Sequence, residues 1–391
     1  MHAIVGSIAL IFLMAGISPG QSADTSGTVP LMKKKIVEYG WDVPTPDYIR
    51  AHIRDMEQRP FDGLLFRCQG GTNVLEPKVW TESAFASDYE NLANTAWEKF
   101  TDNFVMMLAA SEQDWFDDAQ WSAILSNTRL VAKAGALGKC IGVCFDPEPY
   151  GKNPWTFTEV AHKDLSFAEY EAICRRRGAE FIQAIEAEFP HPRILSFYQI
   201  SLFKEYCVPM TPQERATKLA QHPYALYPAF FQGMLEAASP GVYFIDGNEN
   251  AYYYTESSQY FSAYHLAKQQ ALYLIDPALW NKYRAQVQSG QALYVDQYFG
   301  LRADRVLGNY MTASEQAMWF EHNVYWALAS TDEYVWCYSE RLNWWTNQGV
   351  PKDAESAIRS GRTKHDSGAP LKFDLAPIVR SSSKREHGVT D

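Results

Sequence analysis

The chain has 391 residues, of which 47% are hydrophobic and 21% charged, and its formal net charge is −11. It can bury the core of one large domain or of two ordinary ones. An acidic chain whose body lacks a block of Lys and Arg is a poor match for nucleic acid or for an anionic membrane surface.

Residues 1–23, "MHAIVGSIALIFLMAGISPGQSA", have the pattern of a secretory signal peptide. The apolar run Ala3–Ala15 is shorter than the ~20 residues that span a membrane, and the small residues Ser22 and Ala23 follow it. No Lys or Arg precedes the run, so an uncleaved anchor is the rival interpretation. We expect cleavage near Ala23, export to the periplasm or the extracellular space, and no membrane anchor in the mature chain.

After this leader, short β-rich runs alternate with longer helical stretches. We expect eight strands, at residues 35–43, 63–68, 103–111, 140–146, 193–202, 242–246, 292–299 and 333–338. Helix starts are predicted at Thr45-Pro46, near Asp117, and at two capping boxes, Ser166–Glu169 and Thr312–Glu315.

This alternation is typical of a single (β/α)8 barrel, which we place at residues 31–350. An open doubly wound sheet is the alternative, but such a sheet usually has a glycine-rich turn after its first strand, where this chain has "YGWDVPTP". Residues 351–391 are polar and end in "RSSSKREHGVTD", and we expect them to form a mobile extension.

Six cysteines show neither a disulfide framework nor a CxxC pattern, and Cys68, Cys144 and Cys337 fall within predicted strands. We therefore expect unpaired core thiols. The nine histidines form no HxH or HExxH motif, so the sequence predicts neither a metal nor an organic cofactor.

Acids and aromatic residues accumulate where the predicted strands end, which is where the chemistry of a barrel is placed. The residues at these ends are Trp41, Asp42, Glu112, Asp114, Trp115, Asp146, Glu148, Tyr150, Asp246, Glu249, Tyr252, Tyr253, Tyr254, Asp296, Tyr298, Trp336, Tyr338, Glu340, Trp344 and Trp345. Interior layers of a barrel favour Val, Ile and Leu, so a purely structural role rarely explains such a set.

The stretch "GVCFDPEPYG" at 142–151 places Asp146 and Glu148 two positions apart. Alternation along a strand puts both on the face of Gly142 and Cys144, which suits the crowded barrel interior. Two acids this close cannot both ionise freely, so one should keep a proton near neutral pH. A protonated acid beside an ionised one is the arrangement that cleaves glycosidic bonds. We assign Glu148 as general acid and Asp146 as its orienting partner.

The second catalytic carboxylate is Glu249 or Glu340, and the sequence leaves this choice open. We predict substrate contacts at Trp41, Asp42, Tyr150, Asp246, Trp336, Tyr338 and Trp344. For three of these a structural role is an equal alternative: Asp42 as a helix cap, Asp246 as a turn residue and Trp344 as a packing residue.

The "FDPEPYG" segment resembles the D-x-E end of strand four in chitinase-like retaining glycoside hydrolases. The resemblance implies that Glu148 is the acid/base, that Asp146 orients an acetamido group, and that Trp336 matches a Trp on strand eight. The longer D-x-x-D-x-D-x-E run of those enzymes is absent, because Gly142 and Cys144 occupy the earlier positions.

Residues 35–345 also resemble a group of exported bacterial barrel proteins often encoded near polysaccharide-degrading genes. The shared motifs are "YGWD" (39–42), "FD-x-E-x-YG" (145–151), "DG-x-E" (246–249) and "Y-[ST]-E" (338–340). This resemblance implies a sugar-active barrel without naming a sugar.

We therefore expect an exported glycoside hydrolase that acts on a polysaccharide or oligosaccharide. The alternatives are a non-catalytic barrel that binds glycan on its aromatic residues, and a metal-dependent enzyme in which Asp146, Glu148 and Glu249 bind Ca²⁺ or Mg²⁺. A lyase is a weaker third alternative.

Overall fold

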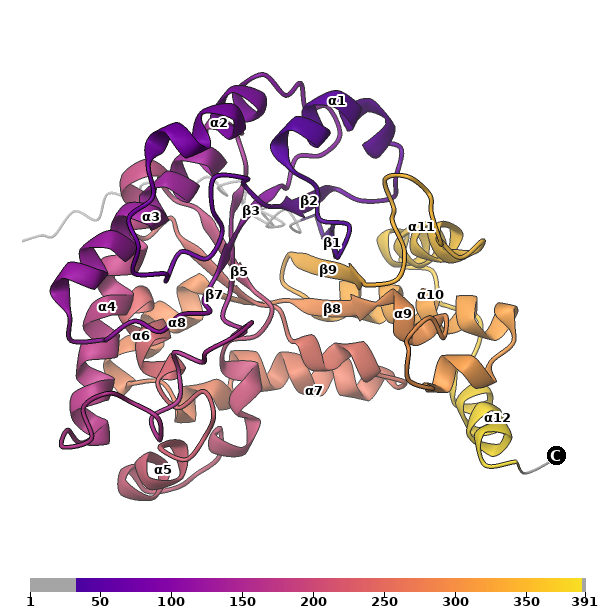
Figure 1. Cartoon of the computed structure of the whole chain (residues 1–391). Coiled ribbons are helices and arrows are strands. Elements are labelled where there is room, and N and C mark those ends of the chain that lie inside the picture. The colour runs from indigo at the N-terminus through magenta and orange to yellow at the C-terminus, as the bar shows by residue number, and fades with distance from the viewer. Residues whose placement is uncertain (1–32, 389–391) are drawn as a thin grey trace, which may run out of the picture. The chain divides into compact units, whose positions relative to one another are not determined.

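The computed structural model describes residues 33–388, so the predicted signal peptide lies outside the described residues. All neighbouring strands of its sheet pair in parallel, in the order β7-β6-β5-β4-β3-β2-β1-β9-β8, and helices surround them (Figure 1). The strands are β1 Lys35–Gly40, β2 Gly63–Phe66, β3 Phe104–Leu108, β4 Gly142–Asp146, β5 Arg193–Ser196, β6 Tyr243–Asp246, β7 Val287–Ser289, β8 Gln291–Tyr294 and β9 Tyr334–Ser339.

Strands β7 and β8 are two halves of one strand, interrupted only at Gly290. The first half pairs with β6 and the second with β9, so this strand brings the two ends of the sheet together. The Gly290 N–H donates to the Asp246 carbonyl at 2.7 Å, and a Cβ on Gly290 would lie 2.9 Å from a methyl carbon of Ile245. The predicted (β/α)8 barrel is confirmed.

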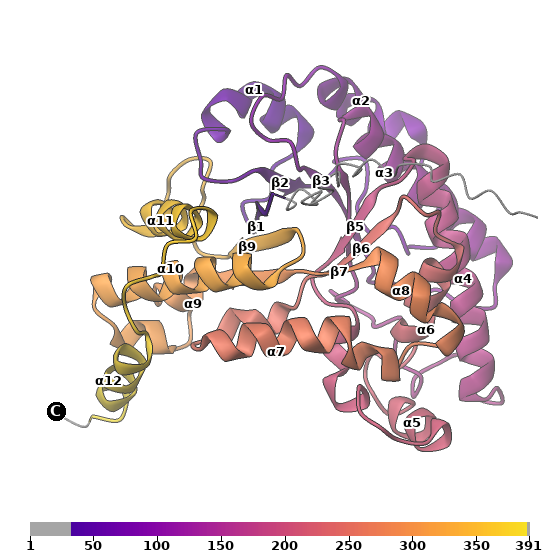
Figure 2. The ribbon, with the colours of Figure 1, turned by 180° about the vertical axis from the view of Figure 1, so that it is seen from behind.

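Helices cover the outside of the barrel (Figure 2). The α-helices up to β9 are α1 Pro46–Met56, α2 Ala86–Ala93, α3 Asp118–Leu137, α4 Phe167–Glu188, α5 Pro212–Leu219, α6 Tyr227–Ala237, α7 Ser257–Lys268, α8 Trp280–Gln286, α9 Val295–Tyr298 and α10 Ala313–Ser330. Short 3-10 helices are η1 Glu82–Phe85, η2 Ile200–Tyr206, η3 Glu249–Tyr253, η4 Gln270–Tyr273, η5 Pro277–Leu279 and η6 Leu307–Tyr310. Within residues 33–388, no helix combines the length and the apolar character that crossing a membrane requires.

The predicted helix starts are present. Asp117 caps α3 by accepting the N–H of Ala119 at 2.8 Å, and both predicted capping boxes form, at the starts of α4 and α10. Thr45 precedes α1 as its N-cap residue, although its side chain makes no capping hydrogen bond.

Several predicted strands are too long at their C-terminal ends, and in two of them a helix takes the place of the predicted strand. The fifth stops at Ser196, and residues from Ile200 form η2 instead of continuing to residue 202. The seventh begins earlier than predicted, at Val287, and its predicted C-terminal part from Val295 is helix α9. In both cases the apolar residues beyond the strand are buried by long-range packing, which a local pattern does not distinguish from strand pairing.

The segment after β9 is also more structured than its polar composition suggested. Residues 351–391 contain α11 Ala354–Asp366 and α12 Ala376–Glu386. Helix α11 lies against α10, where a Cβ on Gly361 would meet the Glu321 carbonyl at 2.9 Å and Lys364 forms an ion pair with the Glu321 carboxylate. Residues 354–366 therefore form a helix that packs on the barrel, whereas the expected mobility of the segment stays a prediction.

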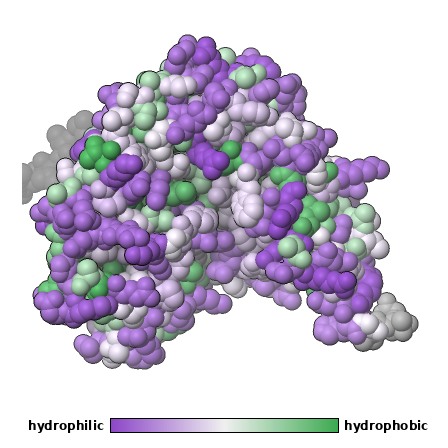
Figure 3. All heavy atoms as spheres, in the orientation of Figure 1, coloured by the Kyte–Doolittle hydropathy of each residue, from purple (hydrophilic) through white to green (hydrophobic). Residues whose placement is uncertain are grey.

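The face seen in Figure 3 is largely hydrophilic, with apolar residues scattered among polar ones. All six cysteines are buried and unpaired, as predicted. Phe145 of β4 packs on Phe181 of α4 and Phe230 of α6, with ring centroids 5.1 and 6.0 Å apart. Alternation then directs Cys144 and Asp146 into the barrel, which is the orientation predicted from the sequence.

Glu38 on β1 is a buried acid that sequence analysis did not single out. It is fully buried, and within the described residues its carboxyl shares a hydrogen bond with the Asp42 side chain, another acid. Burial, and next the charge of Asp42, raise the pKa of Glu38 well above its usual value. Burial likewise raises the pKa of Asp42 to about 6. In the folded protein, therefore, Glu38 retains a proton that the unfolded chain would release at neutral pH.

We predict that wild-type stability falls as the pH rises from about 5 to 8, because a raised folded-state pKa makes ionisation oppose folding. Because the amide cannot ionise, Glu38→Gln should remove most of that loss, which amounts to at most ~1.4 kcal/mol per pH unit for one group. Denaturant unfolding at the two pH values measures it.

Glu57→Gln is the matched control for this experiment. Glu57 is buried too, but one of its oxygens accepts the backbone N–H groups of Glu98, Lys99 and Phe100 at 2.7–3.1 Å. Its replacement should destabilise the protein at both pH values. A Glu38→Gln protein that is destabilised equally at pH 5 and pH 8 would contradict the protonated state of Glu38.

Candidate active site

Three carboxyl groups converge at the C-terminal mouth of the barrel. Asp146 ends β4, Glu148 follows two residues later, and Glu249 begins η3 after β6. The pKa of the fully buried Asp146 is raised well above its usual value, first by burial and then by the charges of Glu148 and Glu249. Asp146 Oδ1 accepts the Glu148 N–H at 2.9 Å, which fixes the turn between them.

Glu249 is the group that the structure pairs with Glu148. Burial and the charge of Glu148 raise the pKa of Glu249 to about 7. Its backbone N–H donates to the Phe197 carbonyl at 3.1 Å, so the end of β5 fixes the start of η3. Of the two acids between which the sequence left the choice open, Glu249 is the one whose pKa the charge of Glu148 raises; which of them is the second catalytic carboxylate stays a prediction.

Glu340 belongs to a second cluster of polar groups. The Asp296 carboxylate accepts the backbone N–H groups of Glu340 and Arg341 at 2.9 and 2.8 Å, and the Tyr338 hydroxyl donates to Glu340 at 3.2 Å. Burial, and next the hydrogen bond and charge of Glu340, raise the pKa of Tyr294, so Glu340 lies close to this tyrosine. This cluster lies at the β8 and β9 ends of the mouth.

Stacked aromatic rings form the floor of the mouth. Trp336 is only 1% exposed and stacks on Phe197 with a centroid distance of 4.3 Å, and its Nε1–H donates to the Gly247 carbonyl at 2.8 Å. Tyr39 stacks on Phe197 and on Tyr338, at 4.6 and 5.3 Å. Trp336 was predicted to contact substrate directly; it instead packs beneath the mouth and has no open face.

Asp246 is a structural residue, which corrects its predicted substrate role. Register places it on the helix-facing side of β6, opposite Ser196. Its carboxylate accepts the N–H groups of Gln199 (3.1 Å), Ser201 (2.8 Å) and Asn248 (3.4 Å), and also the Ser201 hydroxyl. It therefore holds the start of η2 close to the turn that carries Glu249.

Asp42 and Trp344 hold each other in place. The Trp344 N–H donates to Asp42 Oδ2 at 2.7 Å, and Asp42 Oδ1 is buried. The Trp344 ring is fully buried and packs edge-on against Phe61 at 5.2 Å. Both were predicted to contact substrate; the Trp344 ring is packed inside the protein instead, while Asp42 is half-buried and its predicted contact stays a prediction.

Accessible aromatic faces remain at other predicted positions. Trp41 is 68% exposed and Tyr150 is 57% exposed, while Tyr338 is half-buried at the rim. The charge of Asp146, after burial, raises the pKa of Tyr150, so this tyrosine lies next to the acids. Trp41 follows β1, Tyr150 follows β4 and Tyr338 belongs to the C-terminal half of β9, so all three lie at strand ends on the mouth side of the barrel.

Three tyrosines near the acids were not singled out by the sequence analysis. Burial is the main cause of a raised pKa at Tyr39, Tyr198 and Tyr224, and the charge of Asp146 adds to it at each. Tyr39 had a signal, since it opens the "YGWD" motif. Tyr198 and Tyr224 come from the segments after β5 and before α6, where no motif marks them.

Within residues 33–388, no group of three or more His, Cys, Asp or Glu side chains is arranged to hold a metal ion. The groups that act on the mouth acids are other carboxyls, tyrosines and backbone N–H groups.

Comparisons with known proteins give likenesses to solved barrels at low sequence identity. No family model and no curated protein matches the chain. A chitinase from Pseudoalteromonas aurantia is 12% identical with a TM-score of 0.40, covering 84% of this chain and 100% of that one. A GH5_18 protein from Streptomyces cattleya in complex with GlcNAc is 13% identical with a TM-score of 0.47 and 92% coverage of both chains. A sugar phosphate isomerase/epimerase from Parabacteroides distasonis is 11% identical with a TM-score of 0.36, covering 87% and 100%.

We predict that the Glu249 carboxyl titrates near pH 7 and that Glu148→Gln moves its midpoint downward, because the neighbouring charge is lost. Carboxyl-carbon NMR of protein labelled at Glu measures it, and the signal missing from Glu249→Gln gives the assignment. Glu340→Gln is the control and should leave the midpoint in place. If Glu148→Gln leaves the Glu249 midpoint unchanged, the two carboxyl groups do not interact and the prediction is wrong.

Proposed function

We propose that the chain is an exported glycoside hydrolase that cleaves a polysaccharide or oligosaccharide at the mouth of its barrel. One observation carries the proposal: Glu148 and Glu249 interact electrostatically at the mouth, and burial together with the charge of Glu148 raises the pKa of Glu249 to about 7. Cleavage of a glycosidic bond by two carboxyl groups needs one of them protonated and the other ionised.

The charge distribution favours a reversal of the roles that the sequence suggested. Burial, and next the charge of Glu148, raise the pKa of Glu249 to about 7, so we assign Glu249 as the proton donor. In the proposed step, Glu249 gives its proton to the leaving oxygen as the glycosidic C–O bond breaks. Glu148 then attacks the sugar carbon or takes a proton from the attacking water, depending on the room between the two groups. Asp146 positions Glu148 through its backbone N–H.

The surroundings of the pair suit a sugar ring. The exposed aromatic rings of Trp41 and Tyr150 offer flat apolar faces with polar edges. Beneath the pair, the aromatic floor removes water from one side of the mouth, which strengthens the electrostatic coupling between the acids. We assign Trp41, Tyr150 and Tyr338 as the candidate sugar contacts.

We predict that Glu148→Gln and Glu249→Gln each lower glycan hydrolysis by ~100- to 10,000-fold, the range for loss of an acid or base catalyst. Wild-type activity should fall as the pH rises through about 7, because the proton donor is then lost. The purified protein is assayed on a panel of polysaccharides for released reducing ends, and circular dichroism confirms that each variant is folded.

Glu340→Gln is the matched control, since it changes an acid of the same mouth that lies in the Asp296 cluster. It should retain activity within about threefold. If it loses as much as Glu148→Gln does, the two-residue assignment is wrong. Glu148→Gln and Glu249→Gln variants that both stay fully active would end the proposal of carboxylate catalysis.

A further inference from the structure

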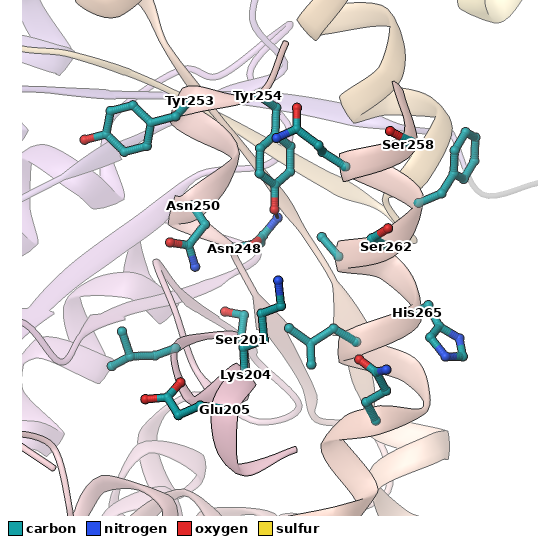
Figure 4. A pocket seen from close by; sticks show the side chains of 16 residues that line it. Ser201, Lys204, Glu205, Asn248, Asn250, Tyr253, Tyr254, Ser258, Ser262 and His265 are labelled. Carbon is teal, nitrogen blue, oxygen red and sulfur yellow. Dashed lines mark hydrogen bonds between the residues drawn. The ribbon is translucent and has the colours of Figure 1, made fainter. Parts of the chain in front are cut away.

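A groove of about 980 Å³ lies between η2, η3 and α7, outside the acid mouth (Figure 4). Asn248 and Asn250 line it, and these residues flank Glu249 on either side in the chain. The η3 turn thus separates the two spaces and contributes to both. Ligand pockets usually enclose ~300–1,000 Å³, so the groove is large enough for a bound small molecule or a short oligomer.

The lining offers neutral hydrogen-bonding groups. The side chains of Asn250, Ser262 and Gln270 line the groove and make no hydrogen bond to any other residue in the part of the chain that the structure describes. Two opposite charges, on Lys204 and Glu205, adjoin each other in η2. A phosphate or a carboxylate ligand would meet no net positive charge here, whereas a neutral polyhydroxylated ligand would find donors and acceptors on several sides.

Two aromatic rings complete the lining. Tyr253 is 53% exposed and Phe261 is 49% exposed, and both line the groove. Phe261 packs edge-on against Trp326 at 5.7 Å, which supports its ring from one side. Flat rings beside free amide and hydroxyl groups are the combination that contacts the two faces of a sugar: its apolar C–H face and its hydroxyl rim.

The inner wall of the groove is fixed by buried hydrogen bonds. Asn248 adopts the left-handed region at φ +46°, and its Nδ2 donates to Gln291 Oε1 at 2.8 Å. Ser201 is bound to the Asp246 carboxylate through both its N–H and its hydroxyl. In Figure 4, Asn248 and Tyr254 lie across from Ser258 and Ser262 of α7, with Ser201 below. These bonds hold one wall of the groove in place without a ligand.

We propose that this groove is a second saccharide-binding site, which takes further units of a neutral glycan alongside the catalytic mouth. The identity of the ligand rests on the proposed function; the existence of a neutral polar binding site rests on the groove itself. Because Asn250 and Tyr253 belong to η3, a glycan in the groove contacts the same turn that carries Glu249.

The test uses the full-length chain with Glu148→Gln, so that no probe is consumed. Cello-, manno-, xylo- and chito-oligosaccharides of two to six units are titrated by calorimetry. Ser262→Trp places an indole in the groove, and Phe261→Ala removes a ring from it; both positions are exposed and should tolerate the change. Ser356→Trp is the matched control, an exposed serine of α11 that does not line the groove.

We expect Ser262→Trp to raise the Kd of the longer oligosaccharides about tenfold or more, or ~1.4 kcal/mol, and Phe261→Ala to act in the same direction. Ser356→Trp should change nothing. A Kd unaffected by both groove variants overturns the proposal, as does the absence of binding by every oligosaccharide in the set.

Hydrolysis by the wild-type chain is followed in parallel, which separates the two proposals. If the wild-type chain hydrolyses glycans and the groove variants bind oligosaccharides normally, the catalytic proposal stands and the second binding site is disproved. If the groove variants weaken binding but the wild-type chain hydrolyses nothing, the second binding site stands and the catalytic assignment is disproved.

Discussion

The mouth depends on one constraint: within residues 33–388, its carboxyl groups are perturbed by burial and by one another, and no cation is among the groups that shift the pKa of Asp146 or Glu249. Asp146 is surrounded by Glu148, Glu249 and tyrosine side chains, and each extra negative charge makes its own ionisation harder. The site can hold these acids together only by keeping protons on some of them. A proton is thereby stored next to an ionised carboxylate, which is the starting condition for acid–base chemistry. The same physics recurs at Glu38 and Asp42, between the barrel and its outer layer.

The position of Glu249 depends on a turn that tolerates almost no substitution. A Cβ on Gly247 would lie 2.6 Å from the Ser196 carbonyl and 2.8 Å from Trp336 Nε1. The next residue, Asn248, is in the left-handed region, where Gly and Asn are least strained. The Asp246 carboxylate then fastens the turn to η2 by accepting the backbone N–H groups of Gln199 and Ser201. In the "DG-x-E" motif, therefore, Asp246 anchors the turn, Gly247 allows the close approach of the backbone to Ser196 and Trp336, and Glu249 is positioned at the mouth.

Sequence patterns predicted the barrel and Asp146 because both depend on local alternation. In "GVCFD" one face is small and the other bulky, so the direction of each side chain follows from the residues themselves. In "VYFID" both faces are apolar, and the pattern cannot show that Asp246 faces the helices. Only the pairing of β6 with β5 settles its direction. The burial of Trp336 and Trp344 was unpredictable for a related reason, since the segments that cover their rings are distant in the chain.

The same dependence on distant segments explains why the tyrosines around the acids carry no sequence signal. Tyr198 and Tyr224 approach Asp146 from irregular segments, and each is defined by what it faces and not by its neighbours in the chain. Such residues adjust the field at the mouth, because a tyrosine hydroxyl beside a carboxyl group stabilises its charge by hydrogen bonding while the ring lowers the local dielectric. The strand ends thus supply the reacting acids, whose places follow from the barrel, while the irregular segments supply the groups that set how easily those acids give up a proton.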